Sequence, residues 1–535
     1  MISTKLIHYT KRALQLGPVT TLKIIQQRSQ TRLFDYYWRY KAQHHLAGHI
    51  LDAHQQQHIR QRIQQQPLSF VHSLHPELLE AELIAHADTF VKKTFDLLGS
   101  GPTTFTTISW HGDFRLQAQN PQVDVLFDAQ AYYKDIQITA GQSEELVKDI
   151  KVPWELSRCQ HLYVLAKAYR LTKNQQYVDA LIEHIDDWIT QNPFLLGPNW
   201  VCPMEVGIRA LNWIVALHAL GDITVLPAPW LSRVINSLYD HMVYLENNWE
   251  IYDGRTSNHY LSDLVGYWYL CDFFAPLDGM GAKKDWCCAE ILKEFAKQVH
   301  QDGTDYEGST AYHGLVTELF YLFYVLCSER GRVLPPLFVT KLHSMFEYLE
   351  QCTTHGGNRV QIGDNDSGVI VWQGLGYGTA DHMKSLAVDG PVYHYPQAGV
   401  SILKTTTSNQ QWHVTLRHHA YQGEQPSGHF HNDTGSVTVA INGIDIFVDP
   451  GSYVYTPSAV WRNHFRSVQA HNTFFIEGQE PIAFDERLFA LNIPENKMPG
   501  TNQADVLTTH HTLYAGLQAQ RRVALDNPHT LTIED

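Results

Sequence analysis

The hydrophobic residues of this chain recur every three or four positions from about residue 80 to 350. Seven segments carry this pattern: 155–172, 177–190, 204–220, 231–249, 260–274, 289–303 and 315–331. Such spacing is typical of amphipathic helices, and short runs of Gly, Pro, Asn and Asp separate the segments. Many helices joined by short loops predict antiparallel hairpins arranged as an array or toroid, almost entirely helical from about residue 80 to 385.

After about residue 385 the hydrophobic period changes to two. The stretches "VSILKT", "WHVTLRH", "SVTVAINGIDIFV" and "NTFFIEG" alternate apolar and polar residues, as half-buried strands do. Asn442 and Gly443, between two such runs, indicate a two-residue hairpin. The second domain is therefore predicted to be antiparallel β, arranged as a sandwich. The chain stops within a strand pattern, "HTLTIED", so we expect a short or truncated β domain.

These patterns predict an α+β multidomain protein with three parts. They are an N-terminal helical and polar segment (1–79), an α/α toroid (80–388) and an antiparallel β-sandwich (389–535). In the first part, the Gln-rich stretch 52–70 is interpreted as a surface helix or linker with no evident chemistry.

Charge and composition narrow the function classes. The chain has 55 acidic and 40 basic residues, a formal net charge of -15, which argues against nucleic-acid binding. Its 7 cysteines are odd in number and form no CxxC pattern, so reduced thiols are expected. No signal-peptide core and no transmembrane run of about 18 apolar residues is visible. We expect a cytoplasmic protein, with export by another route left open; the oligomeric state is not indicated.

Two loops lead into helices with chemically active residues. "DGRTSNHYLSDLVGYW" places Asn258 and His259 near a helix N-terminus, where an anion can bind. The alternative is that Asn258 only caps the helix. "QDGTDYEGSTAYHGLVTELF" likewise places Tyr312 and His313 at a helix start, where the tyrosine either faces a cleft or packs with a solvated hydroxyl.

The stretch "HGGNRVQIGDNDSG" resembles a calcium loop only superficially. With Asp364 as its first position, an EF-hand needs Gly at the sixth position and an acid at the twelfth, where Val369 and Leu375 stand. Asp364 and Asp366 are therefore expected to order a loop through local hydrogen bonds.

A pair of histidines opens the β region. In "GHFHND", an extended backbone would point His429 and His431 to the same face. They either serve one site or are structural or solvated. Downstream lie Asp449 and His471, and two histidines with one aspartate form a plausible zinc set that spacing alone does not establish.

Together these motifs resemble the heparinase II/III-like polysaccharide lyases. The resemblance spans about residues 105 to 480 and rests on the following ordered stretches: "KVPWELSRCQHLYVLAKAYRLT", "NWVCPMEVGIRALNW", "SNHYLSDLVG", "DGTDYEGSTAYH", "IGDNDSG", "GHFHND", "VDPGSYVY" and "FRSVQAHNT". It implies an α/α toroid followed by an antiparallel β-sandwich, and cleavage of acidic polysaccharides by β-elimination.

By this resemblance, Asn258 neutralises the uronate carboxylate, with His259 as its expected helper. Tyr312 protonates the leaving O4 oxygen, and His429 or Tyr312 takes the C5 proton. Tyr453 is a less certain helper because Tyr455 is close by. Further substrate contacts are expected from three residues: His313, Arg462 and Arg466.

In some relatives a zinc ion braces the β domain. The resemblance assigns its ligands to His431, Asp449 and His471 and makes the metal structural. Under this interpretation His429 moves a proton whereas His431 holds a metal.

Two other function classes fit the same motifs. A uronyl C5-epimerase begins with the same proton abstraction, and only product analysis separates it from a lyase. A non-catalytic polysaccharide-binding factor in envelope or capsule assembly needs neither acid nor base. The expected partner is an acidic polysaccharide whose sugar, sulfation and mode of attack the sequence does not reveal.

Overall fold

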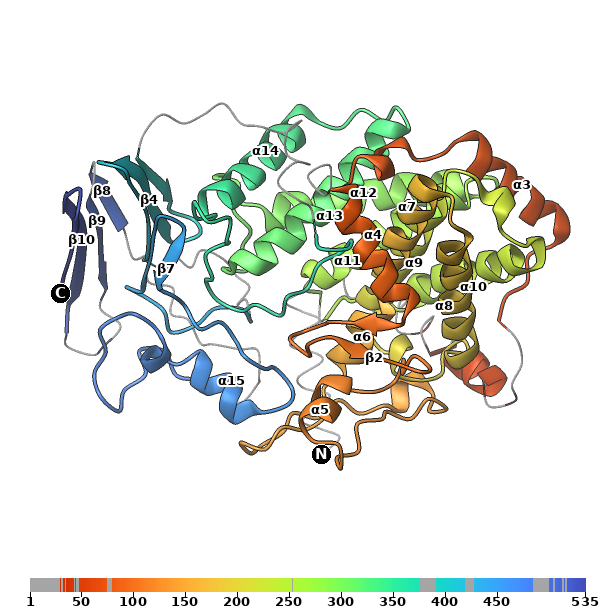
Figure 1. Ribbon diagram of the computed structural model, residues 1–535, viewed down its shortest axis with the longest axis horizontal. Coiled ribbons are helices and arrows are strands. Elements are labelled where there is room, and N and C mark those ends of the chain that lie inside the picture. Colours follow the sequence, from red (N-terminus) through yellow and green to blue (C-terminus); the bar gives the residue numbers. More distant parts are fainter. Residues whose placement is uncertain are drawn as a thin grey trace.

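The computed structural model describes residues 29–535 apart from 30–31, 34, 43, 45–47, 75–78, 253, 375–390, 419–427, 485–499, 504–505, 512–513 and 515–516. Helices form the larger end of an elongated molecule, and two β-sheets form the other end (Figure 1). The predicted fold class, a helical toroid followed by an antiparallel β-sandwich, is confirmed. Among the described residues, no helix has the length and apolar character needed to cross a membrane.

The helical body precedes the sheets in sequence. Its helices are α3 (Ala53–Gln65), α4 (Glu80–Val91), α5 (Phe114–Gln119), α6 (Lys151–Ser157), α7 (His161–Thr172), α8 (Gln175–Gln191), α9 (Pro203–Ala219), α10 (Ala228–Asn247), α11 (Asn258–Phe273), α12 (Met280–Gln298), α13 (Thr310–Glu329) and α14 (Pro336–Gln351). Short 3-10 turns lie at η1 (Ser69–His72), η2 (Tyr133–Asp135), η3 (Pro198–Trp200) and η4 (Ile223–Val225).

Helices α9 and α11 form the centre of this body. Every residue of α9 is buried, as expected for a helix surrounded by others. The two helices approach closely where Gly207 faces Gly266, since a Cβ on Gly266 would lie 2.5 Å from the Gly207 Cα. This contact holds α9 against α11, and the first turns of both helices border the site described below.

Three parts of the helical region differ from the prediction. Residues 352–374, which follow α14, contain no helix. Residues 92–150 are mainly loop, with the short strands β1 (Thr94–Phe95) and β2 (Thr103–Thr104), because side chains compete with the helix for backbone hydrogen bonds. Asp124 and Asp128, for example, each accept the N–H two residues onward. The Gln-rich stretch is also more than a surface linker, since Ile59 of α3 is fully buried in the main core.

Both sheets are antiparallel. The first has the order β3 (Val392–Tyr395), β4 (Val400–Thr407), β5 (Gln410–Arg417), β6 (Val437–Ile441) and β7 (Ile444–Phe447). The second has the order β11 (Thr530–Glu534), β10 (Ala519–Asn527), β9 (Val506–His511) and β8 (Gly500–Gln503). The predicted hairpin is confirmed: Asn442 and Gly443 join β6 to β7 with φ of 52° and 77°.

Apolar residues fill the space between the sheets. Leu403, Val414 and Leu416 from the first sheet share one cluster with Leu507 and Val523 from the second. This packing is the core of the sandwich.

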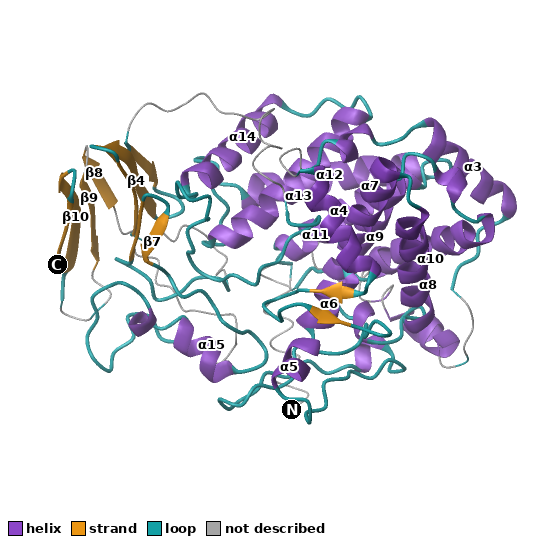
Figure 2. Cartoon of the chain, viewed as in Figure 1, coloured by secondary structure: helices purple, strands orange, loops and turns teal. Residues whose placement is uncertain are grey.

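Many contacts join the helical body to the β domain, and two of them illustrate the junction. At one, Tyr348 near the end of α14 packs with Val400 and Ile402 of β4. At the other, the Gly141 N–H donates to the Thr456 carbonyl at 2.9 Å. Loops from both parts run between these contacts (Figure 2), and the β domain also carries the short helices α15 (Ala459–Phe465) and η6 (Val468–Ala470). The site lies among these loops.

Candidate active site

A cleft of about 410 Å³ lies between the helical body and the β domain. Its walls come from α6, the first turns of α9, α11 and α13, and loops of the β domain. The lining residues are Ile138, Ile150, Lys151, Trp154, Arg158, Cys202, Met204, Glu205, Ser257, Asn258, His259, Tyr306, Glu307, Tyr312, Asp366, Gly428, His429, Tyr455 and Thr456. The cleft therefore contains all three predicted catalytic residues.

Asn258 is the first residue of α11, and Ser257 rather than Asn258 caps that helix. The Ser257 side chain accepts the His259 N–H at 3.3 Å, so the capping alternative for Asn258 is wrong. The Asn258 Nδ2 donates to Glu307 Oε2 at 2.7 Å. Its Oδ1 is buried and has no hydrogen-bond partner among the described residues. The amide is thus held at the cleft wall with bonding capacity to spare.

His259 follows on the same turn and lines the same wall. Its Nδ1 lies 3.1 and 3.2 Å from the two carboxylate oxygens of Glu250. Burial alone would lower the pKa of His259, but the Glu250 carboxylate outweighs it and raises that pKa above its ordinary value. Because its side chain is 41% exposed, His259 can reach a molecule in the cleft.

Tyr312 lies in the first turn of α13, which Ser309 caps. Its hydroxyl donates to Asp366 Oδ2 at 2.9 Å and lies 3.1 Å from the Tyr455 hydroxyl. Burial, followed by the neighbouring Asp366, raises the pKa of Tyr312 well above its usual value. The phenol is therefore protonated at neutral pH, the form that a general acid requires.

His429 stacks on Tyr312, with ring centroids 3.6 Å apart and planes 17° apart. Its Nδ1 lies 2.9 Å from Asp364 Oδ2, and its Nε2 lies 3.6 Å from Glu307 Oε2. Glu307 therefore borders both His429 and Asn258. The three motifs, which lie far apart in the sequence, meet at one point.

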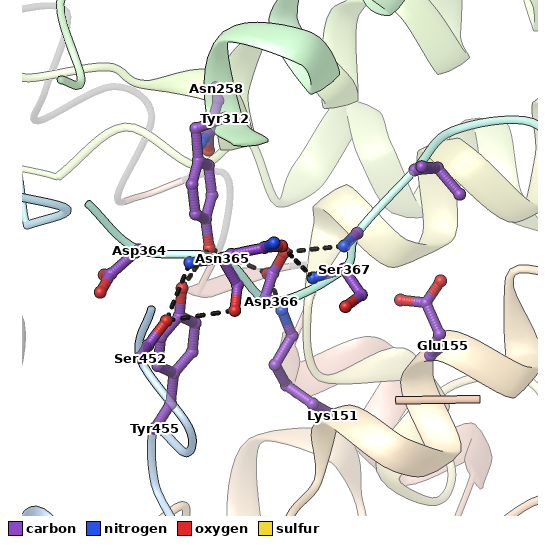
Figure 3. A network of polar contacts seen from close by, with 12 residues as sticks. Lys151, Glu155, Asn258, Tyr312, Asp364, Asn365, Asp366, Ser367, Ser452 and Tyr455 are labelled. Atoms are coloured by element: carbon purple, nitrogen blue, oxygen red, sulfur yellow. Dashed lines mark hydrogen bonds and ion pairs between the residues drawn. The ribbon is translucent and has the colours of Figure 1, made fainter. Parts of the chain in front are cut away.

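Asp366 has a larger role than the loop-ordering one that we predicted. One of its oxygens does accept the Gly368 N–H, at 2.8 Å, as a loop-ordering residue would. The other receives the Tyr312 hydroxyl and pairs with Lys151 (Figure 3). Burial opposes ionisation, but Lys151 holds the pKa of Asp366 well below its ordinary value. Asp366 thus places a fixed negative charge beside the tyrosine.

Asp364 supports the opposite side of the site. Arg462 forms a bidentate pair with it at 2.5 and 2.6 Å, and His431 Nε2 lies 2.8 Å from its Oδ1. Although burial alone would raise it, the pKa of Asp364 is held well below its usual range by Arg462 and the two histidines. From the sequence, a calcium loop was rejected and both aspartates were expected only to order the loop; the "IGDNDSG" stretch was the signal that could have placed them in the site.

Tyr455, not Tyr453, lines the cleft. Tyr453 has a positive φ of 59°, and its side chain is 55% exposed, packing against Trp461 and Phe465 outside the cleft. This left-handed backbone turns its side chain away from the direction that an extended strand would give. The expected tyrosine helper is therefore reassigned from Tyr453 to Tyr455.

Three other predicted substrate contacts lie outside the cleft. His313 is buried, accepts the Asp305 N–H at 3.0 Å and donates to the Met345 carbonyl at 3.0 Å; burial lowers its pKa to about 4. Arg462 is fully buried against Asp364, and fully buried Arg466 donates to Asn463. We therefore correct these assignments: all three side chains serve the packing of the protein.

A possible metal site lies behind His429. The side chains of His431, Asp449 and His471 are buried and offer ligand atoms within 4.8 Å of one another. His471 Nδ1 is 2.9 Å from Asp449 Oδ2, and its buried Nε2 has no hydrogen-bond partner among the described residues. Asp364 orients the His431 ring, as outer carboxylates do for metal-binding histidines. The donor set and its orphaned nitrogen fit a zinc-like ion.

Comparisons with known proteins cover most of the chain. Residues 113–367 match the family model described as heparinase II/III N-terminus, and residues 388–535 match heparinase II/III-like, C-terminal. A heparin-sulfate lyase of Pedobacter heparinus is 23% identical over 403 residues, which cover 71% of this chain and 59% of that protein. A heparin-sulfate lyase of Bacteroides stercoris is 21% identical over 435 residues, covering 73% and 62%. The chain thus spans about three fifths of the length of these relatives.

Solved structures show the same fold. A crystal structure of heparinase III has a TM-score of 0.58 at 16% identity, covering 90% of this chain and 77% of that one. The heparan sulfate lyase HepC from Pedobacter heparinus has a TM-score of 0.52 at 18% identity, covering 88% and 71%. With both family models matched in order and the fold shared, this chain belongs to the heparinase II/III family.

Proposed function

We propose that this protein is a polysaccharide lyase that cleaves a uronic-acid-containing acidic polysaccharide by β-elimination. The observation that carries the proposal is the convergence of Asn258, Tyr312 and His429 on one cleft. An amide donor, a protonated phenol and an imidazole are the groups that this reaction needs. The two relatives named heparin-sulfate lyases support the same reaction class.

The first step is removal of the C5 proton. The Nδ2 of Asn258 has two N–H groups; one donates to Glu307, and the other donates to the substrate carboxylate, so that charge developing on the enolate is stabilised. In the tautomer whose Nδ1–H donates to Asp364, His429 has a basic Nε2. When Nε2 takes the proton, the imidazolium lies 2.9 Å from Asp364 Oδ2 through Nδ1 and 3.6 Å from Glu307 Oε2 through Nε2.

The second step is departure of the O4 oxygen. The C5–H electrons form the C4–C5 double bond, the C4–O4 bond breaks, and the Tyr312 proton passes to O4. For this transfer the Tyr312 hydroxyl exchanges its hydrogen bond to Asp366 for one to the substrate. Tyr455, 3.1 Å away, is placed to donate to the tyrosinate that remains.

A structural zinc ion at His431, Asp449 and His471 is part of the proposal. When bound, it would join three segments of the β domain, and none of the chemical steps above passes through it. Asp364 contacts both His431 and His429, so the ion would also steady the base.

The test is a panel of unsulfated and sulfated uronic-acid polymers, scored for new ultraviolet absorbance from the unsaturated product. Tyr312→Phe should abolish that signal, whereas Tyr453→Phe, the same change outside the cleft, should preserve it. Exchange of the C5 hydrogen with solvent without new absorbance would instead indicate an epimerase. Binding of a polymer with neither signal would indicate a non-catalytic factor.

A further inference from the structure

A second group of metal-type ligands lies on the cleft wall, apart from the residues assigned to proton transfer. Cys202 precedes α9, Glu250 lies between α10 and α11, and His259 is the second residue of α11. The Cys202 Sγ is 3.8 Å from Glu250 Oε2, and His259 Nδ1 is 3.1 and 3.2 Å from the Glu250 oxygens. All three ligand atoms lie within 4.8 Å of one another.

These separations are close to those around a tetrahedral ion. Bond lengths of about 2.3 Å to sulfur and about 2.0 Å to nitrogen or oxygen place neighbouring ligand atoms roughly 3.3 to 3.6 Å apart. The observed separations of Glu250 from Cys202 and His259 fall on either side of that range. Small side-chain movements would therefore seat an ion. Thiolate, imidazole and carboxylate together favour zinc over the harder magnesium and calcium ions.

The surroundings fix this group and leave one side open. The Met204 N–H donates to Glu250 Oε2 at 3.0 Å and the Tyr252 hydroxyl to Oε1 at 3.1 Å, which orients the carboxylate. Glu250 is buried behind the wall, whereas Cys202 and His259 line the cleft itself. Three protein ligands with an open position are typical of zinc sites that bind a further molecule.

The charges of the cleft give such an ion a role. Among the described lining residues, Lys151 is paired with Asp366, and Arg158 is held by Glu205 at 2.7 Å. Glu307 adds a further carboxylate to the lining. An acidic sugar therefore meets cations that are already neutralised. An ion on the wall would supply an attraction for its carboxylate.

We propose that Cys202, Glu250 and His259 bind a zinc-like divalent cation whose open position faces the substrate cleft. Binding releases to solvent the thiol proton of Cys202 and, from each imidazolium form of His259, one ring proton, so that Nδ1 is free to bind the ion. A substrate carboxylate would occupy the open position; this last step rests on the proposed lyase function, whereas the metal site does not. The site is separate from the one formed by His431, Asp449 and His471.

Anaerobic titration of the full-length protein with cobalt(II) tests the site without any activity assay. Thiolate bound to cobalt gives a near-ultraviolet charge-transfer band, which a site of histidines and aspartate cannot give. We expect the band in the parent protein and at least about a tenfold weaker cobalt affinity in Cys202→Ser and His259→Gln. His471→Ala and Cys288→Ser, a buried cysteine in α12, should retain the band.

Circular dichroism shows which variants are folded. If Cys202→Ser does not fold, His259→Gln is used as the test variant. The proposal is overturned if the parent shows no band with two equivalents of cobalt, or if either folded ligand variant gives the band with the cobalt affinity of the parent. Loss of the band in Cys288→Ser would also overturn the proposal, because the bound thiolate would then be Cys288. Lyase activity is scored separately: a band without cleavage of any uronic polymer supports the metal site and refutes the proposed function.

Discussion

Replacing Asp364 by asparagine should destabilise the protein and disable the base together. Each carboxylate oxygen of Asp364 accepts from two donors: Oδ1 from Arg462 at 2.5 Å and His431 at 2.8 Å, Oδ2 from Arg462 at 2.6 Å and His429 at 2.9 Å. An amide keeps only one oxygen, so its NH2 group must face one of these donor pairs. The change also leaves the fully buried guanidinium of Arg462 without its counter-charge.

Removing one partner of a buried ion pair costs about 3 to 5 kcal/mol, and we expect a loss of unfolding free energy in that range. Turnover should fall by about 10² or more because His429 loses the carboxylate that orients it. Urea unfolding followed by tryptophan fluorescence measures the first effect, and ultraviolet absorbance of product from an accepted uronic polymer measures the second.

Asp135→Asn is the matched control. Asp135 forms a similar bidentate pair with Arg39, but the two side chains are 52% and 38% exposed. Exposed pairs contribute about 0 to 1 kcal/mol, so this variant should be nearly neutral. If Asp364→Asn costs no more than Asp135→Asn and keeps full turnover, the supporting role assigned to Asp364 is wrong.

Four further predictions concern the site and the body. Tyr312→Phe should lower turnover by about 10² or more while the melting temperature is kept; unchanged turnover would exclude Tyr312 as the acid. Asn258→Ala should cost about 2.7 to 4 kcal/mol of transition-state stabilisation, measured as kcat/KM, and a change confined to KM would contradict its role at the enolate. Elemental analysis of the parent protein should find zinc, and His471→Ala should lose that ion. The substitution should reduce thermal stability more than turnover, and equal metal content in the parent and His471→Ala would count against the site. Burial alone would raise the pKa of Asp272, but neighbouring basic side chains lower it to about 2, so the ionised carboxylate stabilises the fold by roughly 2 kcal/mol above pH 4. This stabilisation should disappear as the pH falls from about 4 to 2. Asp272→Asn should therefore show a shallower acid-unfolding curve than the parent protein.

The sequence by itself determined the local features of this protein. A hydrophobic period of 3.6 or 2 follows from backbone geometry, so it separated helices from strands without knowledge of their neighbours. The Asn442–Gly443 turn was predictable for the same reason, since both residues tolerate the positive φ that a tight hairpin needs. Asn258, Tyr312 and His429 were predicted as site residues because they lie in motifs that resemble those of a known family, two at helix starts and one in a loop before a strand.

Tertiary structure decided which side chains face the cleft. Because Tyr453 has a left-handed φ, Tyr455 lines the cleft in its place. A hydrophobic period cannot predict the torsion of a single loop residue. Arg462 was predicted to contact substrate. Its guanidinium instead pairs with Asp364, which lies 98 residues earlier in the chain. Such a pairing depends on how distant loops pack across the junction of two domains. The motifs that carry the family resemblance therefore pointed to the chemical groups of the candidate site, whereas their partners, burial and orientation came only from the folded chain.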